Sequence, residues 1–256
     1  MKDFHTHSNY SFDGKESIEH IVQAAIAKGI TTLAITDHFE VQNGVLTFSQ
    51  EKLTAYIQEI SALKTQYKTQ ITLLCGLEVG YVKKYATLLA DALKPHNFDY
   101  IINSVHEVGG DDCYFEAYFK DKIKETAYGE YLEAILDSLD APYPFHTIGH
   151  IGYVCRNAPY SDPSLNYIDF KDIIDKILRK IIAKNKALEL NPNVSGKAKT
   201  HDAFFPNLQI LTAYKNMGGK KVIFGSDAHT LDRLGDMYHD IIHTLKKSDL
   251  KFNPSL

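Results

Sequence analysis

Seven short apolar runs alternate with amphipathic segments along the chain, and this alternation limits the fold more than any other feature. The apolar runs have the length of strands, and the segments between them carry apolar residues at helical spacing. Alternating β and α units predict a parallel sheet whose faces are covered by helices. We expect strands at residues 4–8, 31–37, 71–79, 100–105, 145–151, 187–191 and 221–225.

The segments between the strands predict one continuous α/β domain. A length of 256 residues is ordinary for an α/β barrel, and no Pro/Gly-rich linker divides the chain. Seven βα units that close on themselves give a TIM-like (β/α)7 barrel, one unit short of the common eight. We therefore expect a single domain spanning residues 1–256, with helices at 18–26, 49–67, 86–92, 127–139, 169–185, 206–217 and 236–247.

Composition narrows the class of protein. A net charge of −4 argues against a broad nucleic-acid surface, which is normally basic. Cys75, Cys113 and Cys155 are scattered and form no CxxC motif, which favours a reducing cytoplasm over a disulfide framework. No apolar run is long enough to span a membrane, and no signal peptide precedes the first strand. We expect a cytoplasmic protein without a nucleic-acid or membrane partner, and the oligomeric state stays open.

The first thirteen residues hold three potential metal ligands. His5 and His7 are two positions apart in a strand-like segment, and side chains alternate across a strand, so both imidazoles aim at one point. Asp13 follows just beyond, beside Gly14, where a turn can bring its carboxylate back. A lone HxH is weak evidence for a metal site, because short motifs often arise by chance.

Further ligand-type side chains stand at the ends of the later strands. In a parallel barrel all carboxyl ends of the strands lie on one face, and that face builds the active site. A buried core histidine explains one such residue, but it does not explain six of twelve histidines at successive strand ends. The sequence predicts one converging set of metal ligands: His5, His7, Asp13, His38, Glu78, His106, His150, Asp227 and His229.

Nine nitrogen and oxygen ligands exceed the four or five that one zinc ion takes. With a shared carboxylate they suit two or three ions. Imidazole combined with carboxylate favours zinc, iron or manganese over calcium or magnesium. The sequence thus predicts a cluster of divalent metal ions.

Six short motifs carry a resemblance to a known family. In their order along the chain they resemble the motifs of the PHP (polymerase and histidinol phosphatase) superfamily. The resemblance implies a distorted seven-stranded barrel with three metal ions, and it extends from residue 4 to residue 229. The motifs are His5-Thr6-His7, Thr36-Asp37-His38, Gly76-Leu77-Glu78, Ser104-Val105-His106, Gly149-His150 and Gly225-Ser226-Asp227-Ala228-His229.

The resemblance also implies how the ligands divide among three ions. The first set is His5, His7, Glu78 and Asp227, the second is Glu78, His106 and His150, and the third is Asp13, His38 and His229. Asp13 stands where the family often has histidine, which favours a harder ion there. Chain length and the stretch from Gly149 to Arg156 resemble the monofunctional L-histidinol-phosphate phosphatases of the family.

The implied reaction is hydrolysis of L-histidinol phosphate to L-histidinol and phosphate, by attack of a metal-bridging hydroxide on phosphorus. Asp227 or His229 is the candidate to pass a proton to the leaving alcohol. Arg156 is expected to bind the phosphate, with Lys197 as a weaker candidate. Glu116, in the aromatic loop 114–119, is expected to meet a cationic amino alcohol.

Two kinds of alternative remain open at the level of sequence. The metal motifs are shared with DNA-polymerase exonuclease domains and with bacterial tyrosine-phosphate phosphatases. If the chain is a phosphatase or exonuclease of one of these kinds, its substrate is a phosphotyrosine, a nucleotide or a nucleic-acid end instead of an amino-alcohol phosphate. A metal-binding module without catalysis is the alternative of a different class, and metal-dependent turnover of any phosphomonoester would exclude it.

Overall fold

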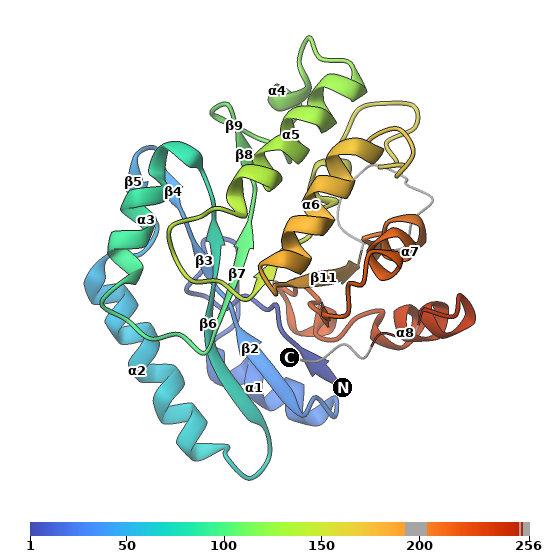
Figure 1. The fold of residues 1–256 in the computed structure, drawn as a ribbon. Coiled ribbons are helices and arrows are strands. Elements are labelled where there is room, and N and C mark those ends of the chain that lie inside the picture. The colour runs from blue at the N-terminus through green and yellow to red at the C-terminus, as the bar shows by residue number, and fades with distance from the viewer. Residues whose placement is uncertain (193–203, 251, 253–256) are drawn as a thin grey trace.

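The computed structural model describes residues 1–192, 204–250 and 252 of the chain. Strands running in the same direction form a central sheet, and helices cover its outer face (Figure 1). The seven parallel strands of this part of the chain follow one another in the sheet in chain order. They are β1 (Lys2–Asp3), β2 (Thr32–Ile35), β6 (Thr72–Gly80), β7 (Tyr100–Ser104), β10 (Thr147–Ile148), β11 (Ala187–Pro192) and β13 (Val222–Phe224).

The segment after β1 brings the two ends of this sheet together. The Phe4 N–H donates to the Phe224 carbonyl at 3.0 Å, and Thr6 forms a parallel bridge with Ala228. The strands therefore curl into a distorted (β/α)7 barrel, as predicted from the sequence. Parallel strands that close in this way place all their carboxyl ends at one mouth.

The first strand is shorter than expected. The regular strand is Lys2–Asp3, and residues 4–8 continue without regular strand structure, with an isolated bridge at Thr6 and single backbone hydrogen bonds beside it. Threonine hydroxyls supply the missing contacts with the neighbouring β2 segment. Thr6 Oγ1 donates to the Ala34 carbonyl at 2.8 Å, and Thr36 Oγ1 accepts from the Thr6 N–H at 3.0 Å. The alternation of His5 and His7 survives because the backbone stays extended.

The main helices lie where the apolar periodicity places them. Ser17 and Ser49 cap the first two, their hydroxyls accepting from backbone N–H groups three residues on. Gly29, with φ of +73°, allows the turn after the first helix. The helices are α1 (Ile18–Ala27), α2 (Gln50–Gln66), α3 (Ala86–Leu93), α5 (Lys124–Ser138), α6 (Lys171–Ala183), α7 (Leu208–Asn216) and α8 (Tyr238–Lys247).

Several short elements follow the strands and were not predicted. β3 pairs with β6, two small hairpins follow β3 and β7, and β12 pairs with β11. They build up the rim of the barrel mouth. They are β3 (His38–Phe39), β4 (Val41–Gln42), β5 (Val45–Leu46), β8 (Glu107–Val108), β9 (Asp111–Asp112), α4 (Glu116–Phe119), β12 (Phe204–Phe205) and the 3₁₀ turns Lys83–Tyr85, Tyr153–Cys155 and Leu231–Arg233.

Apolar side chains fill the barrel interior below the predicted metal ligands. A small inner cluster is separate from the large core between sheet and helices, and Cys75 belongs to that large core. No helix among the residues that the structure describes is long and apolar enough to cross a membrane. The inner cluster consists of Phe4, Ala34, Tyr100, Ile102, Ala187 and Ile223.

Candidate metal centre

Glu78 lies at the centre of the converging side chains. It is near the end of β6, fully buried, and three imidazoles surround its Oε2 atom. His38 Nδ1 is 2.8 Å from this oxygen, His5 Nε2 is 3.3 Å away and His7 Nε2 is 3.6 Å away. Side chains from three strand ends thus meet at one carboxylate oxygen, and they include His38, which the family resemblance assigns to a different set of ligands from Glu78.

The other oxygen of Glu78 faces a second group of imidazoles. His150 Nε2 is 2.7 Å and His106 Nε2 is 3.3 Å from Oε1, and the two Nε2 atoms are 3.3 Å apart. Ser104 Oγ donates to the same oxygen at 2.7 Å. Glu78 therefore separates two clusters of nitrogen atoms and is placed to be shared between them.

Asp227 completes the first cluster, and its spacing matches a tetrahedral site. Its Oδ1 atom lies 3.2 Å from His7 Nε2 and 3.5 Å from His5 Nε2. Ligands about 2.0–2.1 Å from a tetrahedral zinc ion are separated from one another by about 3.3–3.4 Å. His5, His7, Glu78 and Asp227 could therefore hold such an ion with little rearrangement.

Asp13 joins a third group, at the more open side of the site. Its Oδ1 is 3.6 Å from His38 Nε2, and its Oδ2 is 3.2 Å from His229 Nε2. The adjacent Gly14 lies so close to the Ser8 carbonyl that a Cβ would come within 1.9 Å of the oxygen. This glycine lets the chain fold back, so that Asp13 reaches His38 and His229.

The atoms that face one another in these groups lack ordinary partners. Most of the buried side-chain nitrogen and oxygen atoms without a hydrogen bond in the described residues belong to the predicted ligands. Buried polar groups are normally satisfied, so a set of unpaired lone pairs aimed at common points fits bound cations. The atoms that face one another are His5 Nε2, His7 Nε2, His38 Nδ1, Glu78 Oε2 and His229 Nε2; His150 Nδ1 is also unpaired, but Nε2 is the His150 atom that meets Glu78.

Local charges hold the carboxylates in the form that binds metal. Burial alone would raise the pKa of Glu78, but His5, His106 and His38 lower it well below its usual range. Burial likewise opposes ionisation of Asp227, yet Arg156 keeps the pKa of that carboxyl low.

Burial also changes the pKa values of the imidazoles. It lowers the pKa of His7 and of His150, which favours the neutral, ligating imidazole. For His106, Glu78 and Glu40 outweigh burial and raise the pKa to about 10. Positive charge is thus favoured close to Glu78.

A family model, the PHP domain, matches residues 3–193 of the chain. The chain belongs to the PHP domain family. A histidinol-phosphatase of Lactococcus lactis subsp. lactis is 34% identical over 247 residues, which cover 96% of this chain and 90% of that protein. A probable histidinol-phosphatase of Thermotoga maritima is 30% identical, covering 98% and 94% of the two chains.

A solved structure resembles the whole fold of this PHP domain protein. The crystal structure of the Lactococcus lactis histidinol phosphate phosphatase, complexed with zinc, L-histidinol and phosphate, superposes with a TM-score of 0.85. The two chains are 30% identical, and the match covers 98% of this chain and 94% of that one. All nine side chains predicted as ligands lie at the mouth of the barrel.

Two glutamates of the site were missed in the sequence. Glu40, just after β3, lies 3.3 Å from His106 Nδ1 and forms a further group with His38 and His106 that could hold a metal ion. Glu189, on β11, lies 2.6 Å from His5 Nδ1. A charged residue inside the apolar run 187–191 is the signal that points to Glu189, because a buried carboxylate in a strand needs a partner.

Hydrogen bonds behind the ligands orient their rings. Asp37 accepts from the Ser11 hydroxyl at 2.6 Å and from the Ser8 hydroxyl at 2.7 Å. Ser11 Oγ, having donated its proton to Asp37, accepts from His7 Nδ1 at 3.1 Å. This arrangement leaves the lone pair of His7 on Nε2, the atom that faces Glu78 and Asp227.

Arg156 is buried beside the predicted ligands, so it is not a solvated surface arginine. It belongs to the turn that follows β10, and its Nη2 donates to Asp227 Oδ2 at 2.7 Å and to Asn191 Oδ1 at 2.8 Å. Its guanidinium group lies over the ring of Tyr153, with Cζ 5.2 Å from the ring centre. The contacts hold the guanidinium at the wall of the cavity that the metal-type residues line.

This cavity has a volume of about 700 Å³ and opens at the mouth of the barrel. Tyr114 and Phe115 of the aromatic loop line it, as expected for a loop over the substrate. Tyr118 and Phe119 instead pack in the core. The prediction for Glu116 is wrong, because its side chain is exposed on α4 and does not line the cavity. Lys197 lies outside the residues that the structure describes.

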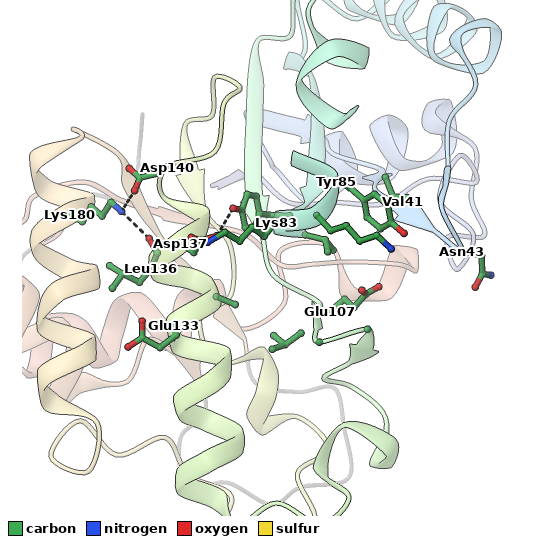
Figure 2. A pocket seen from close by; sticks show the side chains of 17 residues that line it. Val41, Asn43, Lys83, Tyr85, Glu107, Glu133, Leu136, Asp137, Asp140 and Lys180 are labelled. Carbon is green, nitrogen blue, oxygen red and sulfur yellow. Dashed lines mark hydrogen bonds and ion pairs between the residues drawn. The ribbon is translucent and has the colours of Figure 1, made fainter. Parts of the chain in front are cut away.

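A second cavity has a volume of about 860 Å³ (Figure 2), and part of its lining, including Glu107, is shared with the first cavity. Four of its charged side chains form ion pairs: Lys180 with Asp140, and Lys83 with Asp137. None of the unpaired buried atoms of the described residues lies in its wall. Of these two cavities, the first is the one lined by the grouped ligand atoms found among the described residues.

Proposed function

We propose that this protein is a metal-dependent phosphomonoester hydrolase that converts L-histidinol phosphate to L-histidinol and phosphate, a reaction of histidine biosynthesis. The observation that carries the proposal is the convergence of unpaired imidazole and carboxylate atoms around Glu78, with Arg156 in the same cavity wall. The similarity to histidinol-phosphatases over nearly the whole chain supports the choice of a small amino-alcohol phosphate as substrate.

We further propose three divalent ions, of zinc, iron or manganese, in one domain comprising residues 1–256. The sets are those that the family resemblance implies: His5, His7, Glu78 and Asp227; Glu78, His106 and His150; and Asp13, His38 and His229. Interatomic spacings of 3.2–3.6 Å support the first set, and the spacings of 3.2 and 3.6 Å around Asp13 support the third. The free, buried cysteines are compatible with the reducing cytoplasm in which we place the protein.

When bound, such ions supply a hydroxide at neutral pH and neutralise charge on the phosphoryl group. The residues of the chain position the substrate. Arg156 uses one nitrogen for Asp227 and Asn191, so its remaining N–H groups are available to the phosphate oxygens. Asp227 has both oxygens engaged, by Arg156 and by His5 and His7. His229, which is partly exposed at the cavity, has both ring nitrogens engaged as well, by Asp13 and by the Asp227 carbonyl, so both residues stay candidates for the proton passed to the leaving alcohol.

A kinetic screen of phosphomonoesters on protein assayed for bound metal tests the proposal. The panel contains L-histidinol phosphate, phosphotyrosine and nucleoside monophosphates, so that it separates the competing phosphoesterase activities. We expect the highest kcat/KM for L-histidinol phosphate and loss of turnover after chelation. A preference for phosphotyrosine or a nucleotide, or turnover that persists in metal-free protein, would contradict the proposal.

A further inference from the structure

Glu189 is a carboxylate sealed inside the barrel. Its neighbours Leu188 and Leu190 belong to the large core outside the sheet, so alternation along β11 turns Glu189 inward. The residue is 1% exposed. Among the described residues its one ion-pair partner is His5, and no lysine or arginine forms an ion pair with it.

Both oxygens of Glu189 contact predicted ligands. Oε1 lies 2.6 Å from His5 Nδ1, and Oε2 accepts the backbone N–H of His150 at 2.6 Å. An ionised carboxylate can only accept, so His5 must carry its proton on Nδ1. The lone pair of His5 is then on Nε2, the unpaired atom that faces Glu78 and Asp227.

The surrounding chain makes room for this contact. A Cβ on Gly225 would lie 2.1 Å from Glu189 Oε1 and 2.5 Å from the Cβ of His5. Glycine at the end of β13 is therefore needed for Glu189 and His5 to meet. A buried carboxylate without a full counter-charge is costly, and it is retained where a cation nearby offsets that cost.

The other predicted ligands have weaker support behind their rings. His7 Nδ1 contacts a serine hydroxyl, and His229 Nδ1 contacts the Asp227 carbonyl. His106 Nδ1 contacts Glu40 at the longer distance of 3.3 Å, and that carboxylate also lines the open cavity. Of these four contacts, the one between Glu189 and His5 is the shortest and the most deeply buried.

We propose that Glu189 is a positioning residue of the metal centre. It holds His5 as an Nε2 ligand, and it ties His5 to His150, so that residues of two different metal sets keep a constant separation. A carboxylate behind a ligating imidazole also increases the basicity of the ring and strengthens metal binding. The inference rests on the metal centre of the proposed function, but not on the identity of the substrate.

The test compares zinc binding by Glu189→Gln, Glu189→Asp and wild-type protein. Apo proteins are titrated with zinc against a chromophoric chelator, and melting temperatures are recorded with and without zinc. Gln presents an N–H₂ group to one of the two donors that Glu189 accepts from, so one contact becomes repulsive. We expect zinc affinity about 10- to 100-fold weaker in Glu189→Gln and a smaller zinc-induced rise in Tm. Glu189→Asp keeps the charge and should be intermediate.

Tyr100→Phe is the matched control for loss of a buried hydrogen bond inside the barrel. The Tyr100 hydroxyl donates to Thr147 at 2.9 Å and contacts no predicted ligand. This variant should keep the zinc affinity of the wild type, even if its apo form is less stable. A merely structural role for Glu189 would lower both apo and zinc-loaded stability equally and leave zinc affinity unchanged.

Wild-type zinc affinity in Glu189→Gln would overturn the inference. If Glu189→Gln does not fold, the Glu189→Asp variant is decisive. Its side chain is one methylene shorter and cannot contact both His5 and His150, so wild-type zinc affinity in Glu189→Asp would also overturn the inference. Wild-type protein that binds zinc but fails to hydrolyse L-histidinol phosphate would overturn the proposed substrate, while the zinc titration still decides the role of Glu189. Wild-type protein that binds no zinc, iron or manganese would overturn both.

Discussion

Removal of metal should destabilise the folded protein, because buried ligand atoms then lose their partners. His5 Nε2, His7 Nε2 and Glu78 Oε2 are inaccessible to solvent and have no hydrogen-bond partner. A buried polar atom left unsatisfied costs about 1–3 kcal/mol, so these three atoms alone give a lower limit of about 3 kcal/mol. In a chain of this size 1 kcal/mol corresponds to about 2–4 °C in Tm, so we expect chelation to lower Tm by at least about 6 °C.

Differential scanning calorimetry of metal-loaded, chelated and reloaded protein measures this effect. All scans are run at one fixed pH, so that the samples differ only in bound metal. A His7→Gln variant is the control, since loss of one ligand should reduce the response to chelation. Protein that elemental analysis shows to be metal-free, yet that melts at the temperature of the loaded form, would refute the reasoning.

Three further predictions concern individual side chains. His150→Ala and Asp227→Ala should abolish phosphate release while circular dichroism shows an intact fold; near wild-type turnover with full metal content would disprove their assignment. Arg156→Ala should raise KM for L-histidinol phosphate because it removes a phosphate contact, and an unchanged KM would exclude that contact. Burial raises the pKa of Cys75 to about 12, so the reactive thiolate forms only at strongly alkaline pH. Thiol reagents should label Cys75 at pH 8 only in denatured protein, and rapid labelling of native protein would contradict its burial.

The parts of the site that sequence predicts are those tied to strand ends. His38, Glu78 and His150 stand at or beside the carboxyl ends of strands, so the topology of a parallel barrel alone brings them together. His5 and His7 needed only the alternation of an extended chain, which holds although the regular strand ends at Asp3. Hydrophobic pattern and topology are enough for such positions.

Positions that depend on how a loop packs could not be predicted. Glu116 was placed over the substrate because its loop is aromatic, but Tyr118 and Phe119 turn into the core and direct Glu116 to solvent. The role of Glu40 could not be predicted, because Glu40 lies between β3 and a hairpin that the polar sequence does not indicate. The direction of a side chain in such segments is decided by tertiary contacts, which local pattern does not encode.

Closing the barrel and assembling the metal centre involve the same short segment. The backbone of His5 accepts from the Asp227 N–H at 2.9 Å, and the His7 N–H donates to the Ala228 carbonyl at the same distance. Asp3, just before them, accepts the N–H groups of Ser226 and Gly235, which joins β1 to the segments after β13. The hydrogen bonds that close the sheet therefore also set the positions of His5, His7 and Asp227. Cations bound by these three side chains would bridge the first and last strands, so that metal binding and barrel closure reinforce each other.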